Sequence, residues 1–304
     1  MSGALTDMLR RNRFDVVQIE SSQMAPLIPD AGVPVVLDEH NVEFMLLARL
    51  SAMEASPARR TFGRLEAFKA RREELSAWAA ADGIVFTSQP DLAVMRRLAP
   101  ESRGCVVPNG VDVEYFQPRG EDVDADTVVF TGSINYRPNT DAVDHFIRQV
   151  FPAVRRRRPS ARFIVVGQGA PDWLVRSAPT GVEFTGPVDD VRPHVARASV
   201  VVAPLRSGSG TRLKILEALA MAKPVVSTRI GCEGIAVVDG DHLCVADDPE
   251  DFAANVVRLM SDRKVAREMG RRGRTLVESS YSWDVVGRRL EKFHSELIGK
   301  ETRV

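Results

Sequence analysis

The segment from Pro204 to Ala218 gathers two cations and a carboxylate where an apolar run gives way to a helical pattern. Arg212 and Lys214 would lie in the first helical turn, where positive charge is unfavourable without an anion because that end of the helix dipole is positive. A bound diphosphate would resolve the conflict. Glu217, one to two turns further on, could accept hydrogen bonds from two vicinal ribose hydroxyls. The alternative is a solvated cationic face on which Glu217 pairs with Lys214.

Glycines in the same segment would let a ligand approach the backbone closely. Gly208 and Gly210 give the backbone before the predicted helix more conformational freedom. Thr211 can cap the first turn of that helix. The residue order does not match the eight-residue phosphate loop that ends in Gly-Lys-Ser/Thr. The segment therefore predicts an anion site built from a turn and a helix start, different from that loop.

A second turn of small residues follows another apolar run, within the segment from Phe130 to Asn139. Gly132 and Ser133 lie in this turn, and Pro138-Asn139 leads into a helix whose free amides could face an anion. An ordinary turn between a strand and a helix is the alternative interpretation.

Two further polar segments also follow apolar runs. The first, Asp38 to Glu43, contains His40, which could exchange a proton with a reacting group near neutral pH or simply make a structural hydrogen bond. The second, Gly186 to Val191, holds adjacent aspartates that predict a helix start rather than a metal site, because no histidine or third acid is near. Backbone groups near Val188 could meet a flat base.

Short Val- and Ile-rich runs that do not alternate with polar residues predict strands buried on both faces of parallel sheets. Helical patterns lie between them, which predicts an α/β fold. The predicted strands are Asp15–Glu20, Pro34–Asp38, Gly83–Thr87, Cys105–Val107, Thr127–Thr131, Arg162–Val166, Val182–Thr185, Ser199–Ala203, Pro224–Ser227 and His242–Val245. The predicted helices include Leu5–Arg11, Asn139–Arg157, Leu213–Met221 and three between Pro249 and Leu297.

A polar, Gly- and Pro-containing stretch at 109–126 predicts a domain boundary. We expect an N-terminal domain over 1–118, a C-terminal domain over 119–280, and a last helix over 281–304 that crosses back toward the first domain. The C-terminal part shows six strands and the N-terminal part four. The latter opens on a helix, whereas a doubly wound nucleotide-binding domain normally opens on a strand and a Gly-rich turn.

Composition narrows the class of protein. The 304 residues carry 41 basic and 41 acidic side chains, and this zero net charge disfavours a nucleic-acid binder. No apolar run approaches the length of a membrane-spanning helix, and Met1 to Arg13 lacks a signal-peptide core. Three cysteines without Cys-x-x-Cys spacing fit a reducing cytosol, so we expect a cytoplasmic protein.

One region could contact a membrane. The stretch from Arg49 to Glu74 intersperses basic residues with Leu and Phe, as an interfacial helix would. An exposed face of an ordinary helix is the alternative.

Four of these segments together resemble the group 1 glycosyltransferases, family 4, most closely the bacterial exopolysaccharide-type branch. The resemblance covers nearly the whole chain. The family patterns Asp-x-His-Asn-x-Glu, Pro-Asn-Gly-Val-Asp, Phe-x-Gly-Ser-x-x-Tyr-x-Pro-Asn and Gly-Thr-Arg-Leu-Lys-Ile-Leu-Glu-Ala are matched from Asp38 to Glu43, Pro108 to Asp112, Phe130 to Asn139 and Gly210 to Ala218.

The resemblance implies a GT-B fold, in which two Rossmann-like doubly wound parallel-sheet domains face a cleft, and transfer of a sugar from a nucleoside diphosphate sugar. It implies retained anomeric configuration, no metal and no cofactor beyond the donor co-substrate. The acceptor would be a glycan or a lipid-linked molecule at the inner membrane face. The implied catalytic residues are His40, Arg212 and Lys214, and the implied donor-binding residues are Gly132, Ser133, Asn139, Val188, Gly210, Thr211 and Glu217.

Two departures keep other functions open. Relatives often carry a second glutamate eight residues before the position of Glu217, where this chain has Ser209. The N-terminal domain is expected to be incomplete, by about two or three βα units of roughly 30 residues. A truncated, inactive nucleotide-binding remnant or partner subunit is therefore one alternative, and a nucleotide-sugar epimerase of the same fold is another.

Overall fold

The computed structural model describes residues 2–27, 32–52, 54, 56–120, 122–208 and 211–301. The chain divides into two compact units. The first unit comprises Met1–Asn109, Ser209–Thr211 and Asp284–Val304, and the second comprises Gly110–Gly208 and Arg212–Trp283.

Each unit holds one parallel sheet, and all ten predicted strands are present. The first sheet has the order β1-β2-β3-β4, and the second has the order β10-β9-β8-β5-β6-β7. The strands are β1 (Val17–Glu20), β2 (Val35–Glu39), β3 (Gly83–Phe86), β4 (Gly104–Val106), β5 (Thr127–Thr131), β6 (Arg162–Val166), β7 (Val182–Phe184), β8 (Val200–Ala203), β9 (Val225–Ser227) and β10 (Cys244–Val245). All five residues of β5 are buried, as expected for a central strand covered on both faces.

Helices connect the strands in both units. They are α1 (Ser2–Arg11), α2 (Glu43–Ala52), α3 (Pro57–Ala80), α4 (Gln89–Leu98), α5 (Arg137–His145), α6 (Phe151–Arg157), α7 (Asp172–Arg176), α8 (Arg192–Arg197), α9 (Leu213–Ala220), α10 (Pro249–Ser261), α11 (Arg263–Ser280) and α12 (Trp283–Glu301). A 3-10 segment, η1 (Ser22–Leu27), follows β1, and a π segment, η2 (Phe146–Val150), separates α5 from α6. No helix in the described ranges is long and apolar enough to cross a membrane.

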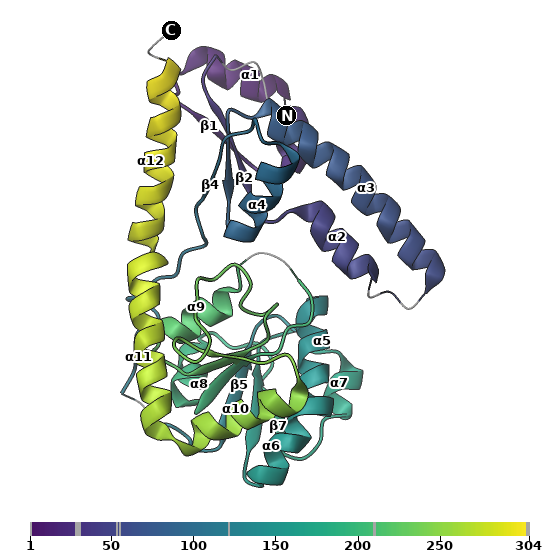
Figure 1. The fold of residues 1–304 in the computed structure, drawn as a ribbon, viewed down its shortest axis with the longest axis vertical. Coiled ribbons are helices and arrows are strands. Elements are labelled where there is room, and N and C mark those ends of the chain that lie inside the picture. The colour runs from purple at the N-terminus through teal and green to yellow at the C-terminus, as the bar shows by residue number, and fades with distance from the viewer. Residues whose placement is uncertain are drawn as a thin grey trace. The chain divides into compact units, whose positions relative to one another are not determined.

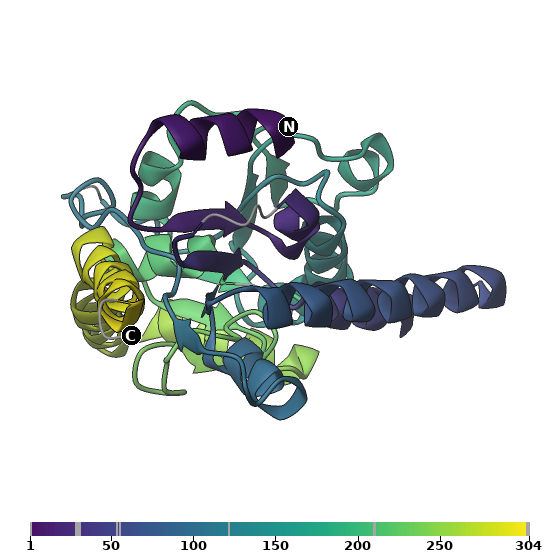
Figure 2. The same cartoon turned by 90° about the horizontal axis from the view of Figure 1, so that it is seen from above.

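In the first unit, the sheet is packed between two apolar clusters. One cluster centres on Trp78 of α3, which is fully buried against Leu37, Ile84 and Phe86. The other joins the opposite sheet face to the last helix, α12, through Phe293 and its neighbours. Helices α2 and α3 run antiparallel and project from this unit as a pair (Figures 1 and 2).

In the second unit, helices cover both faces of the six-stranded sheet (Figure 1). The predicted continuous helix over Asn139–Arg157 is interrupted by η2, where the amide of Phe151 bonds to the carbonyl of Phe146. Pro152 explains the interruption, since its ring has no amide hydrogen and would clash with the carbonyl of Arg148 in a regular helix.

Candidate functional site

Three glycine-containing turns meet at the carboxyl edge of the second sheet. The amide of Gly132, after β5, donates to Val166 at 3.0 Å. A Cβ on Gly167, after β6, would lie 2.0 Å from the carbonyl oxygen of Gly132. Gly167 in turn forms a bridge with Gly186, after β7. Val188 follows two residues later and is partly buried against the core. Ligands of open α/β sheets bind at this edge.

The ammonium of Lys214, in the first turn of α9, reaches the turn after β5. Its Nζ donates to Oδ1 of Asn139 at 2.9 Å and lies 3.8 Å from the ring centroid of Phe130. Gly132 has a φ of 145°, and a Cβ there would lie 2.8 Å from this Nζ. Glycine is favoured at this position because other residues rarely adopt this φ, and a Cβ would also force the lysine ammonium to move.

The buried side chain of Asn139 joins the two turns. Its Nδ2 donates to the carbonyl of Ser133 at 2.8 Å while its Oδ1 accepts from Lys214. Ser133 is exposed, and its hydroxyl donates to Oδ1 of Asn135 at 2.9 Å. Both hydrogen bonds of the Asn139 amide go to protein groups, so this residue positions Lys214.

Burial controls the charges at the start of α9. It lowers the pKa of Lys214 to about 7, with nearby Arg212 adding to the effect and Glu217 opposing it. It also raises the pKa of Glu217, which Lys214 partly offsets. An anion that approached Lys214 would stabilise the ammonium form, so this lysine would gain charge if an anion bound beside it.

The structure changes two sequence expectations here. The N-cap of α9 is Arg212, and Oγ1 of Thr211 has no hydrogen-bond partner within the described residues, so the predicted Thr211 cap is wrong. The hydrogen bond of the Lys214 ammonium goes to Asn139, whereas the alternative interpretation paired it with Glu217. Gly210 lies outside the described residues.

In the first unit, His40 lies directly after β2 at the carboxyl edge of that sheet. Its Nε2 is 3.1 Å from Oε2 of Glu20, at the end of β1, and its carbonyl accepts from Thr87 at 3.0 Å. Glu20 was not singled out from the sequence, whereas Asp38 was noted as the first residue of the polar segment that ends at Glu43. The available signal was position, because parallel neighbouring strands place their last residues side by side.

Glu20, Asp38 and His40 form a cluster in which burial and neighbouring charges shift the pKa of Asp38. Burial raises the pKa of Asp38; Glu20 adds to the rise and His40 opposes it. Gln18 donates to Asp38 at 3.1 Å and to Glu20 at 3.2 Å. One ligand atom from each of the three clustered residues lies within 4.8 Å of the others. The exposed imidazole is held by the carboxylate of Glu20, a placement suited to proton exchange.

Two glycosyltransferase families match successive parts of the chain. The family described as "Glycosyltransferase Family 4" matches residues 1–115, and the one described as "Glycosyl transferases group 1" matches residues 125–262. Together the two matches span most of the chain.

Curated relatives are distant. An uncharacterized 44.6 kDa protein in the cps region of Klebsiella pneumoniae is 21% identical over 293 residues, covering 91% of this chain and 73% of that protein. The phosphatidyl-myo-inositol mannosyltransferase of Mycolicibacterium smegmatis is 27% identical over 209 residues, covering 65% of this chain and 53% of that enzyme. The chain spans about half the length of several such relatives.

Solved structures share the fold. Sucrose-phosphate synthase from Thermosynechococcus elongatus superposes with a TM-score of 0.76 at 18% identity, covering 98% of this chain and 77% of that one. Anabaena Alr3699/HepE, solved in complex with UDP and glucose, gives a TM-score of 0.75 at 13% identity, with 97% and 81% covered. The expected GT-B fold is thus confirmed. With both halves matched by its families, this chain belongs to the group 1, family 4 glycosyltransferases.

Proposed function

We propose that this chain transfers a sugar from a nucleoside diphosphate sugar to a glycan or lipid-linked acceptor. The observation that carries the proposal is the Lys214 ammonium, held by Asn139 beside Gly132 at a helix start that also bears Arg212. Breaking the bond from the sugar to the diphosphate leaves negative charge on the departing phosphate. Preorganised cations and helix amides stabilise that charge.

The roles proposed for the other residues are those that the family resemblance implies. Glu217 would accept from the ribose hydroxyls, the turn with Gly132 and Ser133 would line the donor site, and the backbone near Val188 would meet the base. His40 would act near the transferred sugar. We assign no protein nucleophile, and we propose a reaction that retains anomeric configuration and needs no metal.

Replacing Glu217 with alanine should weaken UDP or GDP binding about tenfold to a hundredfold. The loss corresponds to one or two hydrogen bonds from ribose hydroxyls to a carboxylate. Calorimetric titration of the nucleotides into the full chain measures the change. Glu114→Ala, which removes an exposed carboxylate elsewhere in the second unit, is the matched control. Equal affinities for the Glu217 variant and the wild type would remove Glu217 from the donor site.

Replacing His40 with alanine should lower turnover about a hundredfold, the scale of a lost proton-transfer group, while nucleotide affinity stays unchanged. Glu20→Gln should lower turnover less, because it removes the group that holds the imidazole. The double variant should be no slower than the His40 variant, since the two residues act as one unit. Fully additive losses, measured by nucleoside diphosphate release, would contradict this pairing.

We further propose a place in exopolysaccharide biosynthesis at the cytoplasmic face of the membrane. Support comes from the exopolysaccharide-type motifs and from the Klebsiella relative, whose name places it in a cps region.

Helix α3 supports membrane contact. Phe62, Leu65 and Phe68 are 65%, 56% and 59% exposed, and their spacing of three places them on one side of the helix. Exposed Lys69 and Arg72 lie among them. An apolar side with interspersed cations suits a surface of anionic lipid, which offers both burial and opposite charge.

A triple variant, Phe62→Ser/Leu65→Ser/Phe68→Ser, should bind vesicles of phosphatidylcholine with phosphatidylglycerol at least tenfold more weakly than the wild type. Vesicle flotation measures the bound fraction. Trp173→Ser, which removes an exposed aromatic residue from the second unit, should have no effect. Equal binding by the triple variant and the wild type would place membrane contact elsewhere.

A further inference from the structure

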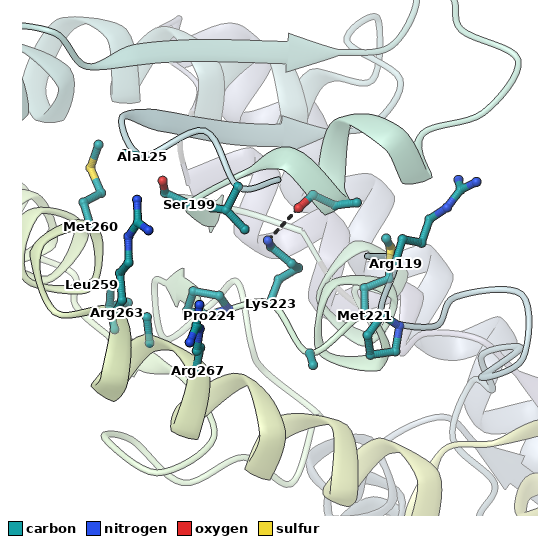
Figure 3. A pocket seen from close by; sticks show the side chains of 15 residues that line it. Arg119, Ala125, Ser199, Met221, Lys223, Pro224, Leu259, Met260, Arg263 and Arg267 are labelled. Atoms are coloured by element: carbon teal, nitrogen blue, oxygen red, sulfur yellow. Dashed lines mark hydrogen bonds between the residues drawn. The ribbon is translucent and has the colours of Figure 1, made fainter. Parts of the chain in front are cut away.

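A cavity of about 320 Å³ lies within the second unit, away from the glycine turns (Figure 3). Its lining includes Ala125, Ser199 and Pro224, which directly or closely precede β5, β8 and β9. Because the sheet is parallel, these residues mark its amino edge, whereas the donor turns follow the carboxyl ends of the strands. The cavity also reaches Met221 and Ala222, at the far end of α9 from Lys214. It is therefore separate from the proposed donor site.

The charge around this cavity is one-sided. Arg119, Lys223, Arg263 and Arg267 line it, and among the described residues no lining residue is acidic. Arg263 and Arg267 are four residues apart, so they rise from one face of α11, as Figure 3 shows. Within the described residues, neither of these two exposed arginines forms an ion pair.

The nearby carboxylates are already engaged. Asp124 pairs with Arg162 and Arg197 at 3.3 and 3.2 Å. Asp190 pairs with Arg192 at 2.8 Å and with Arg119 at 3.6 Å.

The carboxylate at the start of α11 is also engaged in hydrogen bonds. The carboxylate of its N-cap, Asp262, accepts from the amides of Lys264 and Val265, both at 3.0 Å. In the part of the chain that the structure describes, the positive charge of Arg263 and Arg267 therefore lines the cavity without a carboxylate to neutralise it.

The remaining lining residues could pack against the apolar part of an organic ligand. Met221 and Leu259 are buried apolar side chains of the wall, and Pro224 adds a further apolar surface. Lys223, itself buried, donates from Nζ to the carbonyl of Ala196 at 2.8 Å and adds positive charge (Figure 3). A volume near 300 Å³ with apolar walls and a few convergent polar groups is typical of small-molecule sites.

We propose that this cavity binds a small organic phosphate monoester. Its phosphate would be held by Arg263 and Arg267, and its apolar part would pack against Met221 and Leu259. A phosphate monoester carries roughly −1.5 to −2 charge near neutral pH, which two guanidinium groups neutralise with paired hydrogen bonds.

The test titrates 1-naphthyl phosphate into the full chain by calorimetry. The wild type should bind one equivalent, and Arg263→Ala/Arg267→Ala should bind at least tenfold more weakly. Lys264→Ala/Arg271→Ala removes two charges from the same helix without touching the lining, and it should bind as the wild type does. Inorganic phosphate lacks the apolar ring and 1-naphthol lacks the phosphate. Each should bind the wild type at least tenfold more weakly than 1-naphthyl phosphate does.

Two further binding experiments distinguish this cavity from the proposed donor site. Saturation with UDP, or replacement of Lys214 by alanine, should leave the affinity for 1-naphthyl phosphate unchanged. The proposal is overturned if the wild type does not bind the probe, if Arg263→Ala/Arg267→Ala binds it equally well, or if UDP displaces it. None of these outcomes depends on sugar transfer, so the proposed function is tested independently.

Discussion

Replacing Lys214 with alanine is expected to lower the rate of sugar transfer by about two to three orders of magnitude, the cost of losing one preorganised group that stabilises developing charge. The ammonium lies in a partly buried site where attraction to a departing diphosphate is weakly screened. Release of nucleoside diphosphate from a donor sugar measures the loss.

Two further variants make this expectation specific. Asn139→Ala, which removes the acceptor that positions the ammonium, should reduce transfer by a smaller factor than Lys214→Ala. Lys264→Ala, which removes an exposed lysine from α11, should transfer at the wild-type rate. A Lys214 variant with wild-type turnover would contradict the assignment of the diphosphate site.

The pH dependence of binding supplies a second readout for Lys214. Burial holds the pKa of its ammonium at about 7 in the free protein, so the charge is present below that pH and is lost above it. A bound diphosphate raises this pKa, and binding therefore takes up a proton above pH 7. Nucleotide affinity should fall by up to about tenfold per pH unit above 7. Lys214→Ala should abolish this part of the dependence.

The second large effect concerns two buried glutamates of the first unit. Glu39 is 3% exposed and accepts from Nε1 of Trp78 at 3.1 Å. Glu74 is 1% exposed and accepts from the amides of Glu43 and Phe44, at the start of α2, at 2.7 and 2.8 Å. Burial raises the pKa of Glu39 to about 8, with Glu74 adding to the effect, and burial raises the pKa of Glu74 to about 7.

The first unit should therefore lose stability as pH rises. A carboxyl whose folded pKa is raised stabilises the fold where it is protonated, and that stability declines from the unfolded pKa up to the folded one. For Glu39 this window runs from about 4.5 to about 8. Ionisation of Glu39 should therefore lower the free energy of unfolding by roughly 3 kcal/mol between pH 5 and pH 8.

Denaturant unfolding followed by tryptophan fluorescence measures this loss. Trp78 is fully buried, whereas Trp173 and Trp283 are 51% and 58% exposed, so the spectral shift reports mainly on the first unit. Glu39→Gln keeps an acceptor for Trp78 and should flatten the pH dependence. The exposed Glu73→Gln should retain it. Equal slopes for Glu39→Gln and the wild type would disprove the role of Glu39.

The sequence was sufficient to predict the strands and the turns that follow β5 and β8. All ten apolar runs became strands, most within one or two residues of their expected bounds, because a buried parallel strand needs an uninterrupted apolar run. The turns at Gly132 and before Lys214 were predicted because glycines and other small residues follow an apolar run there and precede a helical pattern.

Contacts across long sequence separations could not be predicted. Lys214 and Asn139 are 75 residues apart, and only the packed sheet brings them into hydrogen-bond distance. The pairing of Glu20 with His40 depends on strand order, which no local pattern encodes. The Thr211 cap failed for a local reason, since the helix begins one residue later than a cap there requires.

Sugar transfer by this chain is best examined by incubating the full chain with UDP-, GDP- and ADP-sugars, without acceptor and in EDTA. We expect one nucleotide class to be hydrolysed slowly to nucleoside diphosphate and free sugar, and we expect Lys214→Ala not to hydrolyse it. Conversion of a donor into a different nucleotide sugar would instead identify an epimerase. Failure to consume any donor, together with no measurable binding of UDP or GDP, would contradict the proposed function.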